Sequence, residues 1–404
     1  MGILDKQHML WYNDDAERFK MMNRIFAFFK KETVLCVSFI LAVASMFIVP
    51  PDRNYWEYID FRTLAILFCL MSVMAGLQKI GVFDRVAKKL LGHVKSGHSL
   101  VLTLVLLCFF SSMFITNDVA LITFVPFTFI VLNMLGEEQK DRLLLPIVVL
   151  QTIAANLGSM LTPLGNPQNL YLYGKAGLSI YEFLMLMLPY TLLSLVLLVG
   201  WSVIQGRVCP QIPKLDGASV QQGPSHGKKA VYPLVVYLML FLLCLLTVGR
   251  ILPWQAAFIA VLIIVFAVDR QVLVKVDYSL LFTFICFFIF IGNVGRIPAF
   301  RDFLQGMIAG REVYTAVIVS QVISNVPAAL LLSGFTENFA GLIIGTNLGG
   351  LGTLIASMAS LISYKYVAKE ANERKSKYIL LFTAGNIFFL ALLVLLYILL
   401  GSQA

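Results

Sequence analysis

The sequence predicts an all-α polytopic membrane protein built from two inverted repeats, and three observations lead to this fold class. Of the 404 residues, 59% are hydrophobic and only 13% are charged, whereas charged residues make up about a quarter of ordinary soluble domains. Apolar runs long enough to cross a bilayer recur from Thr33 to the C-terminus. Polar motifs of the first half return, in register, in the second half.

Nine apolar runs are predicted to cross the bilayer, because a hydrocarbon core of about 30 Å needs roughly 20 helical residues. These spans cover residues 33–50, 62–79, 143–172, 181–203, 231–250, 254–268, 278–295, 341–364 and 378–400. Two further runs, 100–132 and 313–340, are broken by polar residues at their centres. We interpret each of them as a re-entrant helical hairpin that returns to its own side of the membrane.

The distribution of Lys and Arg supports this topology, because basic residues are retained on the cytoplasmic side. Segments placed inside hold 24 of the 31 basic residues. We therefore expect a multi-pass protein of the plasma (inner) membrane with a cytoplasmic N-terminal segment 1–32, a cytoplasmic loop 204–230 and Ala404 outside. If 100–132 were a single span, the basic loops 204–230 and 365–377 would face outward.

The internal repeat is visible in matched blocks. Ile59-Asp60-Phe61 and Val276-Asp277-Tyr278 each open a span. Two longer blocks align without gaps: Ser112, Thr116, Asn117 and Ala120 on Ser320, Ser324, Asn325 and Ala328, and Asn156, Leu157, Gly158 and Thr162 on Asn347, Leu348, Gly349 and Thr353. Each repeat, 33–203 and 254–404, holds four spans and one hairpin, and the loop and linking span 204–253 invert the second copy. Secondary transporters are often organised in this way, with the binding site where interrupted helices of both halves meet.

Four interrupted segments carry the polar residues of the predicted site. The second of them, 156–169, reads NLGSMLTPLGNPQN, which holds too much Gly, Pro and Asn for an unbroken helix. Unwound backbone at membrane depth is packed in protein or lines a wet cavity, and half-helix N-termini there attract anions. The candidate substrate- and ion-binding residues are Ser112, Thr116, Asn117, Asp118, Asn156, Gly158, Thr162, Gly165, Asn166, Asn169, Ser320, Ser324, Asn325, Asn347, Gly349, Thr353 and Ser357.

The interrupted segments contain no Lys or Arg, so an anion there would be held by amides, hydroxyls and helix dipoles, with a coupling cation nearby. Asp118 is the one carboxylate in the middle of an apolar segment, and intramembrane acids are functional by default. We therefore predict a secondary active transporter of a small anion, in which Asp118 couples transport to Na⁺ or H⁺. The alternative is that Asp118 only caps the second half of its hairpin.

Other classes of protein fit less well. The four histidines lie in polar connecting segments and the six cysteines show no metal-ligand spacing, so we expect no metal site and no cofactor. An intramembrane enzyme, the alternative class, would need a nucleophile with a base or a second carboxylate at the same depth, and we predict that the chain is not an enzyme. The basic residues are spread over many short loops, so we expect no nucleic acid among the partners.

At these motifs the sequence resembles the ion transporter superfamily, which includes divalent anion/sodium symporters, citrate transporters and arsenite efflux permeases. In the divalent anion symporters each hairpin tip carries Ser-Asn-Thr, which is similar to Thr116-Asn117-Asp118 and Ser324-Asn325-Val326 but differs at the third position. The resemblance implies a homodimer, an elevator-like motion and a citrate-like or dicarboxylate-like substrate. Asn-Asp at the first tip is more similar to the arsenite permease branch, so an arsenite/antimonite-type oxyanion efflux permease is the alternative.

Overall fold

The computed structural model describes residues 32–92, 94, 96–207 and 231–401, and within these ranges it contains helices and no strand. Two compact units are present: the chain up to Ile59 with Asp277–Ile297, and Asp60–Val276 with the chain from Pro298 onward. Three predicted features lie outside the described residues: the N-terminal segment 1–32 apart from its last residue, most of the cytoplasmic loop 204–230, and Ala404.

The first unit pairs α2 (Thr33–Ile48) with α13 (Tyr278–Gly295), and the short helix α3 (Tyr55–Tyr58) packs on α13. Asp277 begins α13 as an N-cap, because its carboxylate accepts the N–H of Leu280 at 3.0 Å. Asp60 caps the corresponding helix of the other unit in the same way. Both members of this predicted repeat motif therefore open a helix.

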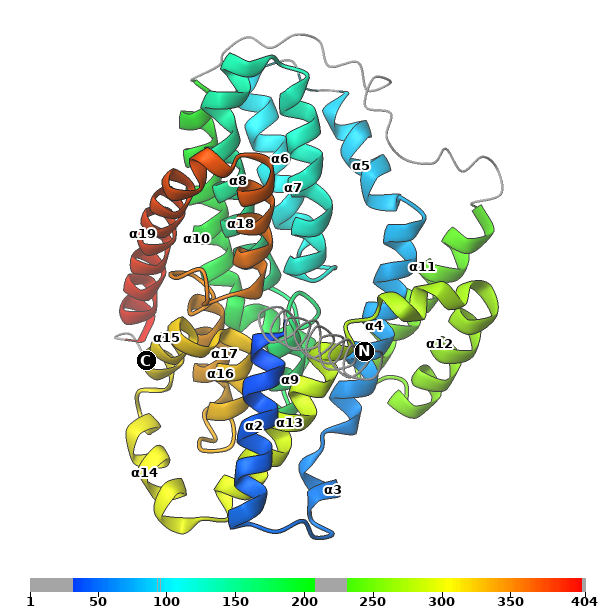
Figure 1. The fold of residues 1–404 in the computed structure, drawn as a ribbon, viewed down its shortest axis with the longest axis vertical. Coiled ribbons are helices and arrows are strands. Elements are labelled where there is room, and N and C mark those ends of the chain that lie inside the picture. Colours follow the sequence, from blue (N-terminus) through cyan, green and yellow to red (C-terminus); the bar gives the residue numbers. More distant parts are fainter. Residues whose placement is uncertain (1–31, 93, 95, 208–230, 402–404) are drawn as a thin grey trace, which may run out of the picture. The chain divides into compact units, whose positions relative to one another are not determined.

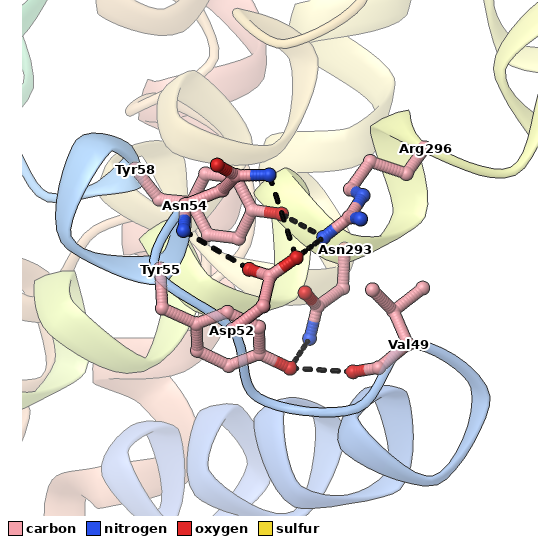
Figure 2. Close-up of polar contacts among 7 residues, drawn as sticks. All are labelled: Val49, Asp52, Asn54, Tyr55, Tyr58, Asn293 and Arg296. Carbon is pink, nitrogen blue, oxygen red and sulfur yellow. Dashed lines mark hydrogen bonds and ion pairs between the residues drawn. The ribbon is translucent and has the colours of Figure 1, made fainter.

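Polar contacts tie the ends of these helices together (Figure 2). Asn293 Nδ2 donates to the Tyr55 hydroxyl at 2.8 Å. Arg296 Nη1 lies 2.7 Å from an Asp52 carboxylate oxygen and 3.2 Å from the Tyr58 hydroxyl. Hydrogen bonds to Tyr58 and Asp52 raise the pKa of the Arg296 guanidinium. The ion pair and the hydrogen bond to Tyr58 hold the segment between α2 and α3 against the end of α13.

The second unit holds the predicted site (Figure 1). Its elements are α4 (Phe61–Lys79), α5 (Val82–Leu91), α6 (Gly97–Ser111), α7 (Asn117–Asn133), α8 (Glu137–Ser159), α9 (Pro167–Ala176), α10 (Ile180–Gly206), α11 (Val231–Val248), α12 (Trp254–Asp269), η2 (Arg270–Lys275), α14 (Pro298–Ile308), α15 (Glu312–Ile323), α16 (Asn325–Leu332), α17 (Phe339–Leu348), α18 (Met358–Glu370), η3 (Asn372–Arg374) and α19 (Lys375–Gly401). Its polar interior lies where these helices are interrupted, as described below.

Six helices of the described residues are long and apolar enough to cross a membrane, and each matches one of the nine predicted spans. Of the other three spans, two are shorter helices, α2 and α11, and the third is divided between α17 and α18. The prediction of a polytopic, all-helical membrane protein is confirmed. The inversion of the second repeat stays a prediction.

All four predicted interruptions are non-helical segments, at 112–116, 160–166, Ser324 and 349–357. The arms of the first predicted hairpin are α6 and α7, and those of the second are α15 and α16; the two arms contact each other in each case. In Figure 1, α6, α7 and α18 lie above the level of the interruptions, whereas α9, α16 and α17 lie below it. The interruptions therefore meet in the interior of the unit.

Candidate functional site

The first hairpin tip is fastened to the first unwound segment by hydrogen bonds. Asn117 begins α7, and its backbone N–H donates to the carbonyl of Gly165 at 3.2 Å. Its side-chain Nδ2 donates to Asn156 Oδ1 at 2.9 Å. Thr162 Oγ1 donates to the carbonyl of Met113 in the tip. Tip and unwound segment thus satisfy polar groups that neither could satisfy alone at membrane depth.

The second hairpin repeats this arrangement at the equivalent positions. Asn325 begins α16, and its backbone N–H donates to the carbonyl of Ala356 at 3.0 Å. Thr353 Oγ1 donates to the carbonyl of Gln321 at 3.1 Å. The turn itself differs, because it is completed at Ser324 with a φ of +75°. Such a backbone is strained for a residue other than glycine, and strain of this kind is concentrated at functional sites.

The two halves also contact each other reciprocally. Asn347 Nδ2 donates to Asn169 Oδ1 at 2.7 Å. Asn156 Nδ2 lies 3.5 Å from Ser360 Oγ. In the repeat, Asn156 is equivalent to Asn347, and Asn169 is equivalent to Ser360. The asparagine that precedes each unwound segment therefore contacts the residue that follows the other unwound segment. A two-fold relationship between the halves requires such a pair of contacts. These contacts support the repeat that the sequence predicts.

Asn156 is the centre of this network and is 4% exposed. Its Oδ1 accepts hydrogen bonds from Asn117 Nδ2 and from Ser357 Oγ, at 2.9 and 3.0 Å. Its Nδ2 lies 3.5 Å from the carbonyl of Gly350, and a Cβ on Gly350 would lie 3.0 Å from Asn325 Nδ2. Both tips and both unwound segments thus meet around one side chain. A shared cavity at this point stays a prediction.

Four of the predicted residues mediate close helix packing. Ser112 and Ser320 are buried and donate to carbonyls of their own helices, at 2.9 and 2.7 Å. A Cβ on Gly158 would lie 2.6 Å from Ser112 Oγ, and a Cβ on Gly349 would lie 2.6 Å from Ser320 Oγ. Both glycines therefore allow a hairpin arm to approach the interrupted helix. A binding role for these four residues is untested.

Asn166 and Asn169 hold the first unwound segment in shape. Asn166 Nδ2 donates to Ser159 Oγ at 2.6 Å. Asn169 Nδ2 lies 3.2 Å from the carbonyl of Ser159 and 3.3 Å from that of Thr162. The bond to the Ser159 carbonyl satisfies one of the carbonyls that the end of α8 leaves free. Of the other predicted residues, Thr116 and Ser357 occupy the N-cap positions of α7 and α18 without a capping bond from the side chain.

Asp118 lies in the first turn of α7, where its carboxylate is half-buried. Its backbone N–H donates to Asn117 Oδ1 at 2.9 Å. At the second tip the N–H of Val326 donates to Asn325 Oδ1 in the same manner. The two tips thus share this hydrogen bond and differ in charge, and the acid occupies a helix N-terminus that favours negative charge.

The family model described as citrate transporter matches residues 25–340. The chain belongs to the citrate transporter family. The predicted resemblance to the ion transporter superfamily is thereby confirmed, and the protein is a multi-pass membrane protein of a transporter family.

Two relatives of this citrate transporter family protein are similar over most of its length, and a third is similar over less than half of it. An uncharacterised transporter of Methanocaldococcus jannaschii is 31% identical over 340 residues, which cover 84% of this chain and 89% of the relative. The inner membrane protein YbiR of Escherichia coli is 31% identical over 342 residues, 83% of this chain and 87% of the relative. The silicon efflux transporter LSI3 of Oryza sativa subsp. japonica is 27% identical over 168 residues, 40% of this chain and 33% of the relative.

Two glutamines of the interrupted segments were not among the predicted binding residues. Gln321 Nε2 donates to the carbonyls of Gly349 and Leu351 at 3.0 and 2.9 Å, and its Oε1 accepts the N–H of Thr353 at 2.9 Å. Gln321 therefore supports the second unwound segment. Gln168, in the first turn of α9, is 0% exposed, and neither of its amide atoms has a partner among the described residues. A long amide inside an apolar run was the available signal for both.

Proposed function

We propose that this protein is a secondary active transporter that carries a small anion of the citrate or dicarboxylate class, coupled to Na⁺ or H⁺. The observation that supports this most directly is the network around Asn156, where interrupted helices of both halves converge on one buried amide. Interrupted helices at corresponding repeat positions form the substrate sites of secondary transporters. Transport by the family, whose description is citrate transporter, agrees with this assignment.

The proposed coupling to Na⁺ or H⁺ rests on the charge of the residues around Asn156. Its described contacts are made by amides, hydroxyls and backbone groups, so a bound anion lacks a fixed positive partner. A Na⁺ ion or a proton taken up with the anion would offset part of its charge, and Asp118 is the acid positioned at the first tip. We propose the homodimer and the elevator-like motion of the hairpins on the basis of the family resemblance.

Reconstitution into proteoliposomes tests the proposal. Citrate, succinate, malate, sulfate and arsenite are each offered with a Na⁺ gradient or a pH gradient. We expect gradient-driven accumulation of at least one organic acid, and at least a tenfold lower rate for Asn156→Ala. Asn386→Ala is the matched control, because Asn386 is a buried amide of α19 that bonds within its own helix, to Phe382. Equal loss in both variants, or no transport of any solute, would contradict the proposal.

Arsenite/antimonite-type efflux is the second candidate. It is favoured by the same lack of cationic contacts, because a neutral, protonated oxyacid needs no charge partner in a site of amides and hydroxyls. One relative, from rice, is named a silicon efflux transporter. Expression in arsenite-sensitive cells separates the candidates: an efflux permease should restore growth on arsenite, and a citrate or dicarboxylate transporter should not.

A further inference from the structure

Gln168 presents an unusual combination of burial and missing partners. The residue is 0% exposed, and both Oε1 and Nε2 lack a hydrogen-bond partner among the described residues. Leaving such a group unpaired destabilises the folded state, and native interiors rarely do so without a reason. Gln168 therefore needs a partner that brings both a donor and an acceptor.

The neighbouring amides cannot supply this partner. The Nδ2 groups of Asn166 and Asn169, which flank Gln168 in sequence, already donate to the end of α8 and the unwound segment. Asn347 Nδ2 donates to Asn169 Oδ1 and to the carbonyl of Ile343. Asn347 Oδ1 is itself buried without a partner. Among the described residues, Gln168 and Asn347 thus hold two unpaired acceptors and one unpaired donor, and Asn347 bonds to Asn169, the residue that follows Gln168.

We infer that Gln168 is a specificity-determining residue that binds a hydroxyl-bearing solute in the substrate-bound state. The inference rests on the proposed function. A carboxylate accepts hydrogen bonds and donates none, so a solute without a hydroxyl leaves Gln168 Oε1 unpaired. A hydroxyl beside a carboxylate satisfies both atoms: the hydroxyl donates to Oε1, and a carboxylate oxygen accepts from Nε2. The chemical class selected is therefore a 2-hydroxy carboxylate.

Matched pairs of solutes test this inference in proteoliposomes of the full chain. Malate differs from succinate by one hydroxyl, and citrate differs from tricarballylate in the same way. A site built to bind a hydroxyl rejects an analogue that lacks it, so we expect the KM of the wild type for malate to be at least tenfold below that for succinate, and similarly for the citrate pair. This comparison needs no variant and does not depend on the folding of one.

The substitution Gln168→Met then tests the residue itself. Met keeps the length and removes both unpaired atoms, so we expect a higher Tm together with a KM ratio for malate and succinate within about threefold of unity. Asn386→Leu is the control, because it removes another buried amide with an unpaired oxygen and should leave the ratio unchanged. If Gln168 had only a structural role, the substitution would raise Tm and leave the KM ratio unchanged.

Three outcomes overturn the inference. Equal KM values of the wild type for malate and succinate would show that no hydroxyl is selected, while the proposed function stands. If the KM ratio for malate and succinate were unchanged in Gln168→Met, another residue would select the hydroxyl. If the Na⁺ dependence of transport changed while this ratio stayed the same, Gln168 would be a cation ligand. Transport of none of the organic acids would contradict the proposed function itself.

Discussion

An Asp141 carboxylate oxygen lies 2.6 Å from Arg374 Nη2 and joins the start of α8 to η3. In the predicted topology an even number of crossings separates the two residues, so both lie on the cytoplasmic side. If the hairpin α15–α16 were a full span, the number would be odd and the membrane would separate the pair. The contact therefore supports the re-entrant interpretation of the second hairpin.

Two further ion pairs support the re-entrant interpretation of the first hairpin, α6–α7. Lys79 Nζ lies 2.5 Å from Asp269 Oδ2, between α4 and the end of α12. Arg296 pairs with Asp52 at 2.7 Å. Each pair flanks α6–α7 in sequence, and each would be divided by the membrane if that hairpin crossed it. The ion pairs thus agree with the topology derived from Lys and Arg.

Reporter fusions test this topology. We expect fusions in the N-terminal segment and in the loop 204–230 to report the cytoplasm, and fusions after Gly401 to report the outside, because nine crossings separate the ends in the predicted topology. A fusion between α7 and α8 provides an internal control and should report the cytoplasm. A cytoplasmic C-terminus would mean that one hairpin is a true span, and the inverted repeat would then be wrong.

Asp118→Asn tests the coupling residue. The amide keeps most of the hydrogen-bonding capacity at the start of α7 and removes the charge and the titratable proton. We expect the variant to fold and to exchange substrate across the membrane at near wild-type rate, while gradient-driven accumulation falls at least tenfold. The exposed acid Asp302, which pairs locally with Arg301, provides the control variant Asp302→Asn. Full accumulation by Asp118→Asn under both gradients would place coupling elsewhere.

Gly158→Ala and Gly349→Ala test the close approach of the hairpin arms. A Cβ at Gly158 would lie 2.0 Å from the carbonyl oxygen of Phe109 in α6, and one at Gly349 would lie 2.6 Å from Ser320 Oγ in α15. Overpacking of this kind costs about 1–3 kcal/mol, so we expect a lower Tm and reduced transport in both variants. Gly200→Ala is the control, because no atom lies within 4 Å of its Cβ position; it should be neutral or stabilising.

Cys69 and Cys244 provide a test of the packing of α4 on α11. Both thiols are buried, on two helices that pack against each other, and seven residues away along each helix the ring of Tyr237 covers Gly76. We expect copper–phenanthroline oxidation to join the two thiols. A protease site placed in the loop 204–230 separates α4 from α11, so the fragments should stay linked without reductant and part with it. Cys69→Ser should abolish the link.

The sequence alone was sufficient for the membrane class, the interrupted helices and the matched motifs. Apolar length and the scarcity of charge determine which segments enter a bilayer, and Gly, Pro and Asn in 156–169 break a helix whatever surrounds it. Asn117 and Asn325 could likewise be chosen from register, because their motifs align without gaps. The conclusion that Asp118 lies at the start of a half-helix also needed no coordinates.

Only the tertiary structure decided which of these polar residues meet and which pack helices. The bond from Asn347 to Asn169 joins residues far apart in the chain, and no local pattern specifies such a distance. Gly158 and Ser112 were predicted as binding residues, and this stays a prediction; the structure adds that they pack closely on each other, which depends on the approach of a second helix. Gln168 was not among the predicted binding residues, because the sequence shows only that a polar amide lies in an apolar run. Whether that amide has a hydrogen-bond partner is decided by the folded interior.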